Sequence, residues 1–103
     1  MEKIAIYRGV TPTEATIVSG IGIDGAGDRW TTDLSTAEQY AIRDGGGVFR
    51  LLVDAGKIEP TATAGTCRLL ADRLSNEERM TLAYRKPSES TFINICCKLL
   101  IFN

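Results

Sequence analysis

Histidine is absent from this 103-residue chain. Serine and cysteine hydrolase triads, imidazole acid–base catalysis and most zinc sites use that residue, so the composition excludes their usual forms. Any chemistry must therefore run on carboxylates, arginine, lysine, hydroxyl groups or backbone amides.

Proline is also scarce, with three residues, and the chain has no Gly/Ser linker, internal repeat or low-complexity run. These absences predict a single domain over residues 1–103. No segment approaches the ~20 apolar residues that cross a bilayer, and the N-terminus lacks a secretory signal. We therefore expect a cytoplasmic protein without a membrane partner.

Neither sign of charge dominates, because 12 basic and 13 acidic residues are interspersed along the chain. A nucleic-acid interface needs a basic patch, and the sequence has none, which leaves a nucleic-acid acceptor open but unsupported. The cysteines Cys67, Cys96 and Cys97 are an odd set, and the adjacent pair would lie on opposite faces of a strand. We expect reduced thiols and no metal site, because no further ligands lie at usable spacing.

Hydrophobic periodicity and helix caps organise the N-terminal half of the chain. The sequences Thr11-Pro12-Thr13-Glu14 and Ser35-Thr36-Ala37-Glu38 are capping boxes, each of which predicts a helix start. A glycine-rich loop separates the two helices. The predicted elements are strands over residues 3–8, 29–32 and 48–54 and helices over residues 11–19 and 35–44.

The C-terminal half has a weaker pattern. Residues 59–65 are rich in Thr and Ala and predict irregular structure, 66–74 predict a helical turn, and 78–85 and 91–102 predict strands. The order of elements fits an α+β domain better than a doubly wound parallel sheet. The unusually apolar segment 93–103 also admits a truncated or frame-altered copy, which would associate through its last strand.

The first candidate site residue is Arg8, which ends a predicted strand in the sequence Ile6-Tyr7-Arg8-Gly9. An arginine in this position can clamp a phosphate bidentately, and Gly9 lets a ligand approach the backbone. The alternative is a salt-bridged arginine with a purely structural role.

The second candidate is the segment from Trp30 to Ala41, in which an aromatic residue and two hydroxyls end a strand and lead into a helix. Thr31 and Thr32 can orient an arginine and a ribose hydroxyl. Alternatively, both are ordinary β-branched strand residues and Tyr40 packs in the core.

Together, in this order and spacing and followed by a Gly-rich link and an apolar strand, these segments resemble the NAD-binding half of the ADP-ribosyltransferase superfamily. The similarity is to its arginine–serine–glutamate class and covers residues 4–58. It implies a small ADP-ribosyltransferase-like α+β domain, with short helices packed on a split, mainly antiparallel sheet. It also implies that NAD is bound as a substrate.

The resemblance assigns roles to individual residues. In that family the arginine holds the NAD phosphates, so Arg8 takes this role, and Gly9 contacts nicotinamide through its backbone. Thr31 and Thr32 stand for the first two hydroxyls of a Ser-Thr-Ser strand, and Asp33 replaces the third. These roles require Arg8 and Thr31 on adjacent strands that face one cleft, and side chains on opposite sides of the sheet would remove the family interpretation. The implied cofactor-binding residues are Tyr7, Arg8, Gly9, Trp30, Thr31, Thr32 and Tyr40.

A glutamate on a later strand completes the family's catalytic set, because a carboxylate stabilises the positive charge that develops on the ribose. In the sequence Asn76-Glu77-Glu78, Glu78 is the best match by position and Glu77 the next. The implied catalytic residues are therefore Arg8, Thr31 and Glu78. The alternative for Glu78 is a solvated acidic turn.

Two functional hypotheses follow. The resemblance implies an NAD-dependent mono-ADP-ribosyltransferase, or an NAD glycohydrolase, acting on a macromolecular target. The alternative is a catalytically degenerate binding module of the same fold, for example a small phage- or mobile-element-encoded inhibitor that docks to a protein partner. Binding of NAD without turnover would distinguish the second hypothesis from the first.

Overall fold

Two long strands form the centre of the structure. In the computed structural model, which describes residues 2–95, β1 (Lys3–Val10) and β3 (Gly47–Asp54) pair antiparallel along their whole length. Lys3 lies opposite Asp54 at one end of this ladder, and Val10 lies opposite Gly47 at the other. Both strands were predicted from their apolar periodicity, and the structure confirms them.

Five short strands extend the central pair into one antiparallel sheet, which confirms the α+β class. Within the described residues the strand order is β4-β5-β2-β1-β3-β6-β7. The sheet is continuous rather than split, but β1 and β2 share a single residue pair, Tyr7 opposite Thr31. The five strands are β2 (Arg29–Thr31), β4 (Ile58–Pro60), β5 (Thr66–Leu69), β6 (Ala83–Arg85) and β7 (Ile93–Asn94).

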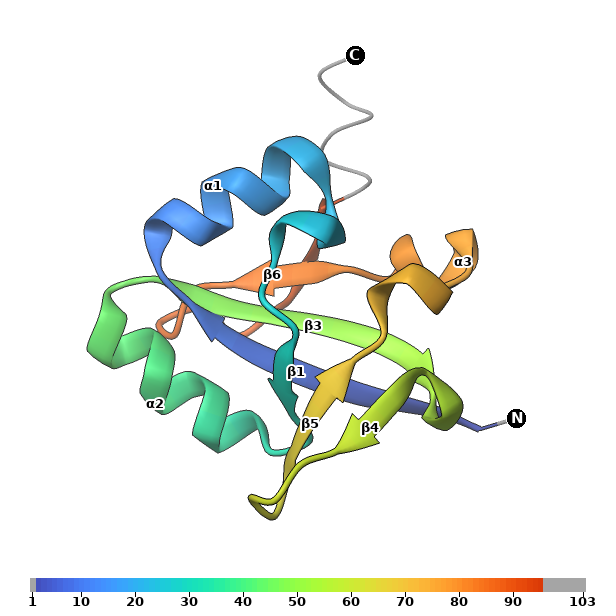
Figure 1. The fold of residues 1–103 in the computed structure, drawn as a ribbon. Coiled ribbons are helices and arrows are strands. Elements are labelled where there is room, and N and C mark those ends of the chain that lie inside the picture. Colours follow the sequence, from blue (N-terminus) through green and yellow to red (C-terminus); the bar gives the residue numbers. More distant parts are fainter. Residues whose placement is uncertain (1, 96–103) are drawn as a thin grey trace.

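Helices lie on both faces of this sheet. Figure 1 shows α1 on one side of the central strands and α2 on the other. The helices of the described part are α1 (Pro12–Ile21), α2 (Leu34–Asp44) and α3 (Asn76–Arg79), with 3-10 turns at Ile23–Gly25, Ala55–Lys57 and Ala71–Arg73.

The alternation of side chains along β1 divides the core between the two helix layers. Ile6 belongs to the larger buried cluster, which includes Val18 of α1. Tyr7, the next residue, packs against a smaller cluster that includes Ala37 of α2 and Val48 of β3. Consecutive residues of β1 therefore serve different faces of the sheet.

Both predicted capping boxes mark a helix start, but neither forms in full. In the first, the Glu14 carboxylate bonds to Arg8 and Gly27 instead of the Thr11 amide. Thr11 caps α1 by accepting a hydrogen bond from the backbone amide of Glu14 at 3.1 Å. Helix α2 is capped by Asp33 instead of Ser35, because the Asp33 carboxylate accepts from the Ser35 amide at 3.1 Å. Glu38, the carboxylate of the predicted box, bonds to Arg85.

The predictions for the C-terminal half are correct only in part. Residues 61–65 are irregular as predicted, but 59 and 60 belong to β4. The helical turn predicted within 66–74 occurs at Ala71–Arg73, but the segment begins with β5, in which Cys67 and Leu69 are buried. The strand over 78–85 is helical at its start, where α3 occurs, and becomes β6 only at Ala83. Of the strand over 91–102, the structure has β7, and residues 96–103 lie outside the described part.

Between residues 2 and 95, no helix is long and apolar enough to cross a bilayer. The same residues contain no group of three or more Cys, Asp or Glu side chains that could hold a metal ion. Cys67 is a buried free thiol, whereas Cys96 and Cys97 lie beyond the described residues.

Gly9 is the point at which α2 approaches β1 most closely. A Cβ at this position would lie 2.3 Å from the Ala37 carbonyl oxygen and 2.8 Å from the Tyr40 Cβ. Gly20, in α1, has no such neighbour within 4 Å. Packing of the helix on the strand therefore requires the glycine at position 9, independently of any ligand.

We expect Gly9→Ala to destabilise the protein by about 1–3 kcal/mol, because the added methyl group displaces α2. Gly20→Ala is the matched control and should stabilise the helix by about 0.5–1 kcal/mol, since alanine has the better helix propensity. Chemical denaturation measures both changes. An equal effect of the two substitutions would contradict the packing argument.

Candidate functional site

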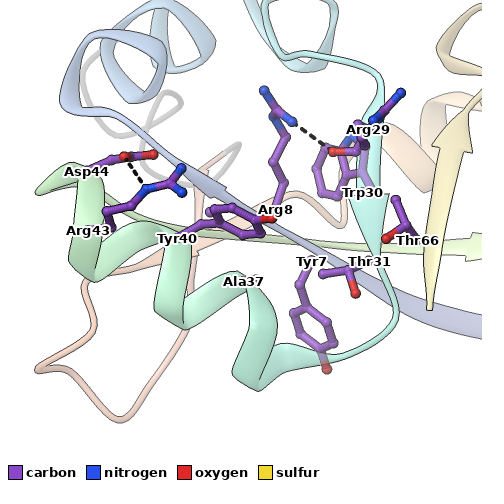
Figure 2. Close-up of a pocket in the computed structure, with 11 residues that line it drawn as sticks. Tyr7, Arg8, Arg29, Trp30, Thr31, Ala37, Tyr40, Arg43, Asp44 and Thr66 are labelled. Atoms are coloured by element: carbon purple, nitrogen blue, oxygen red, sulfur yellow. Dashed lines mark hydrogen bonds and ion pairs between the residues drawn. The ribbon is translucent and has the colours of Figure 1, made fainter. Parts of the chain in front are cut away.

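A pocket opens where β1 and β2 meet beside α2. Its volume is about 290 Å³, and it lies next to the single residue pair, Tyr7 opposite Thr31, that joins the two strands. Figure 2 shows the side chains around it. The lining residues are Tyr7, Arg8, Gly9, Arg29, Trp30, Thr31, Ala37, Tyr40, Arg43, Asp44 and Thr66.

Six of the seven residues expected to bind the cofactor line this pocket, and Thr32 is the exception. Thr32 lies instead at a second hollow of about 340 Å³, beside Cys67 and Pro60. Sequence reasoning missed Arg29, Arg43, Asp44 and Thr66. Arg29 directly precedes Trp30, and Arg43 lies about one helical turn after Tyr40. Thr66 reaches the pocket only because β5 pairs with β2, which its Thr/Ala-rich surroundings did not indicate.

Arg8 and Thr31 lie on adjacent strands and line one pocket, as expected, but their side chains leave the sheet on opposite faces. Tyr7 and Thr31 are direct cross-strand partners and share a face, so Arg8, the next residue along β1, points the other way. Figure 2 shows Arg8 directed away from Tyr7. The expectation of a single shared face is therefore wrong, and a ligand that contacts both side chains must lie across the junction of the two strands.

The guanidinium group of Arg8 is held on the α1 side of the sheet. Its Nε and Nη2 donate to the two carboxylate oxygens of Glu14 at 2.7 and 3.0 Å, and its Nη1 donates to the Arg29 carbonyl at 2.8 Å. Of the five N–H groups of an arginine, two remain without an acceptor among the described residues. Arg8 is thus the salt-bridged arginine of the structural alternative, with donors to spare for a ligand.

Gly27 completes the setting of this arginine. A Cβ at position 27 would lie 2.4 Å from Arg8 Nη2, so a side chain here would displace the guanidinium group from its present position. The Gly27 amide also donates to Glu14 at 3.3 Å. Burial alone would raise the pKa of Glu14, but its contacts with Arg8 and Gly27 outweigh this effect and lower the pKa.

The hydroxyl of Thr31 is occupied by local bonds. It donates to the Gly65 carbonyl at 2.9 Å and accepts from the Asp33 amide at 3.0 Å, and the residue is only 8% exposed. Asp33, which stands at the third hydroxyl position, accepts from the hydroxyls of Thr36 and Ser35 at 2.8 and 2.9 Å. The hydrogen bond from the Thr36 hydroxyl, and to a lesser extent that from Ser35, holds the pKa of Asp33 below its ordinary value. The predicted hydroxyl strand therefore fixes the start of α2.

The opposite wall of the pocket comes from α2. Tyr40 is 48% exposed, so it lies at the rim and not in the core. The Arg43 guanidinium lies 4.7 Å from the centre of the Tyr40 ring and is also bonded to Asp44 at 3.1 Å, as Figure 2 shows for the ion pair. Trp30, on the facing strand, is buried and donates its indole N–H to the Gly27 carbonyl at 3.0 Å.

Glu78 does not line the pocket and is far from Arg8 and Thr31. It is 1% exposed and its carboxylate accepts from Lys57 Nζ and the Asp54 amide, both at 2.8 Å. Asp54 lies opposite Lys3, five residues before Arg8 on β1. At the rise of an extended strand, this separation amounts to roughly 16 Å. The structure therefore does not bring the three expected catalytic residues together.

Local geometry gives Glu78 a structural role. It is the third helical residue of a capping box in which Ser75 Oγ accepts from the Glu78 amide at 3.1 Å and the Glu78 carboxylate accepts from the Ser75 amide at 2.9 Å. Burial alone would raise the pKa of this carboxyl, but the bonds from Lys57, Asp54 and Ser75 more than compensate and lower it well below its usual range. Glu78 is therefore a buried anion that joins α3 to the end of β3, and not a solvated turn residue.

No protein-family model, curated protein or solved structure matched this chain. Functional assignment therefore depends on the pocket itself and on the resemblance of its residues to a family.

We expect Glu78→Gln to destabilise the protein by about 1–3 kcal/mol, because the neutral amide cannot satisfy the Lys57 ammonium and two backbone amides equally well. Glu77→Gln, at an exposed neighbour, should change the free energy of unfolding by less than about 0.5 kcal/mol. Urea denaturation at neutral pH measures both.

The effect of Glu78→Gln should also depend on pH. Folding lowers the pKa of Glu78, so its ionised form stabilises the native state above the ordinary value of 4.5 and loses this contribution as the pH falls below it. The difference in stability between wild type and variant should therefore shrink below pH 4.5. A difference that grows on acidification would disprove the role of the buried anion.

Proposed function

We propose that this chain is an NAD-binding module of ADP-ribosyltransferase-like architecture that holds the dinucleotide without cleaving it. The observation that carries the proposal is the convergence of six predicted cofactor residues on one pocket. These residues come from β1, β2 and α2, and between Gly9 and Trp30 they are separated by some twenty positions of sequence. Their common location supports a shared binding site, whereas the opposite directions of Arg8 and Thr31 count against the family's arrangement of these two side chains.

The size and chemistry of the pocket suit part of a dinucleotide. A volume of about 290 Å³ is at the lower end of the range for small-molecule sites, about 300–1,000 Å³. The pocket therefore admits one nucleoside half, beside the exposed ring of Tyr40. The remaining half lies over the rim, where Arg29 and Arg43 supply positive charge for phosphates.

Phosphate binding by Arg8 works through the two N–H groups that Glu14 and Arg29 leave unused. Because Glu14 already neutralises the guanidinium group, we expect modest affinity for the dinucleotide. A ligand phosphate gains most when it approaches the arginine from the pocket, opposite the carboxylate.

The absence of a suitable carboxylate favours binding over catalysis. Cleavage of the nicotinamide–ribose bond develops positive charge on the sugar, which a preorganised anion has to face. Glu78 is buried at the distant end of β1. Of the carboxylates near the pocket, Glu14 and Asp44 are each paired with an arginine, and Asp33 caps α2. Transferase or glycohydrolase activity on a macromolecular target, which the resemblance implies, has no carboxylate in position among residues 2–95.

We propose that this module acts by docking to a protein partner, because it binds NAD without converting it. Acidic and basic residues are balanced, so an electrostatic interface with nucleic acid has no support.

Calorimetry with NAD tests the proposal. Wild type should bind NAD, and Arg8→Lys should weaken binding by an amount on the order of 1–3 kcal/mol, because a lysine cannot reproduce the fork of donors. Arg73→Lys, at an exposed position outside the pocket, is the control and should bind like wild type. Fluorescence of Trp30, the only tryptophan, gives an independent readout of pocket occupancy.

Nicotinamide release, followed by chromatography under saturating NAD, separates the two functions. We expect none above the uncatalysed rate. Release by wild type that disappears in Glu78→Gln but not in Glu77→Gln would replace the binding module with an enzyme. An absence of NAD binding would reject both.

A further inference from the structure

A second group of polar side chains lies on the same face of the sheet as Tyr7, away from the pocket. Residues that are direct cross-strand partners form a row across four strands: Thr66 on β5, Thr31 on β2, Tyr7 on β1 and Arg50 on β3. Partners in such a row project to the same side. Arg50 therefore stands beside Tyr7 on the α2 face, one strand further from the pocket.

Phe92 lies over this part of the sheet. The guanidinium groups of Arg50 and Arg85 lie 4.8 and 4.9 Å from the centre of its ring, and the Tyr7 ring centre is 6.2 Å away. Phe92 also packs against the buried cluster of Ala37, Ala41 and Val48. An aromatic ring thus shields the two arginines and connects them to Tyr7.

The two arginines differ in how their charge is compensated. Arg85 donates to Glu38 at 2.6 Å and to the Glu89 carbonyl at 2.5 Å. Arg50 is partly buried, and among residues 2–95 its guanidinium has neither a hydrogen-bond acceptor nor an ion-pair partner. The Nε atoms of both residues are buried and unpaired. The cluster of Arg50, Arg85 and Glu38 consequently carries one uncompensated positive charge.

Ring stacking alone does not account for this arrangement. A cation over an aromatic face gains some attraction, but the buried Nε of Arg50 has lost its hydration without gaining an acceptor, while the terminal nitrogens stay open to solvent or to a ligand. Native proteins pair such groups with an anion, a carbonyl or an ordered molecule. With Nε covered by Phe92 and the sheet, the terminal nitrogens are the donors left to a ligand, and their spacing fits two oxygens of one oxyanion.

We propose that Arg50, backed by Phe92 and next to Arg85, binds an oxyanion, the phosphate or carboxylate group of a small ligand, at a site separate from the NAD pocket. Tyr7 lies between the two sites, since it lines the pocket and also contacts Phe92. The site does not depend on the proposed function, because none of its charges comes from Arg8, Glu14 or Glu78.

The test measures unfolding midpoints by chemical denaturation in increasing inorganic phosphate, against sodium chloride of equal ionic strength, with acetate as a parallel series. A ligand that binds only the native state raises the midpoint. Wild type should show a rise specific to phosphate, to acetate or to both, which identifies the oxyanion preferred. Arg50→Gln should abolish that rise, and Arg73→Gln, the same change of charge at an exposed arginine, should retain it.

Arg8→Lys separates this site from the NAD pocket. It should retain the anion-specific rise if the oxyanion binds at Arg50. A rise that disappears in Arg8→Lys and persists in Arg50→Gln would overturn the proposal, and so would a wild type that responds to salt alone. Amide NMR shifts of wild type during the phosphate titration give a second readout that does not require a variant to fold: they should centre on Arg50 and Phe92, and shifts centred on Arg8 would overturn the site.

Discussion

The antiparallel pairing of β1 with β3 fixes most of the other features of this molecule. Because the ladder runs the full length of both strands, each residue of β1 is assigned to one face of the sheet. Even-numbered positions face α1, where Ile4, Ile6 and Val10 pack in the core and Arg8 pairs with Glu14. Odd-numbered positions meet α2 or the open part of the opposite face. The ladder also separates two centres of charge, placing Arg8 toward one end and the Lys3–Asp54 pair with Glu78 at the other.

The parts of the fold that could be predicted from sequence are those in which local pattern and tertiary context agree. The β1 and β3 strands have clear apolar periodicity, and α1 has a cap, a proline in its first turn and a carboxylate at the right spacing. The β4 and β5 strands carry no comparable signal. They form because Cys67 and Leu69 fill the core beside Trp30, a contact that depends on the pairing of β5 with β2.

Glu78 illustrates why a motif position does not define a catalytic role. Its neighbours in sequence offered two patterns: an acidic pair before an apolar run, and a serine three residues before a glutamate. The second pattern is a capping box, the same signal that correctly located α1, and it decided the structure. The pocket residues, in contrast, could largely be predicted. Most of them lie together because β1, β2 and α2, which carry them, are neighbours in the fold.

The directions of the Arg8 and Thr31 side chains could not be predicted, because they depend on the register of β1 against β2.

The contact between Gly27 and the Arg8 guanidinium makes three positions interdependent that are distant along the chain. Any side chain at position 27 would expel the arginine head group, and the same loop supplies an amide to Glu14, the carboxylate that holds that head group. The effects of substitutions at positions 8, 14 and 27 on the free energy of unfolding should therefore be strongly non-additive. Once one of the three residues is replaced, replacing the other two should have little further effect. Among related proteins, we expect these three positions to change together. Where the arginine is replaced, the glycine at position 27 is no longer required and can be replaced as well.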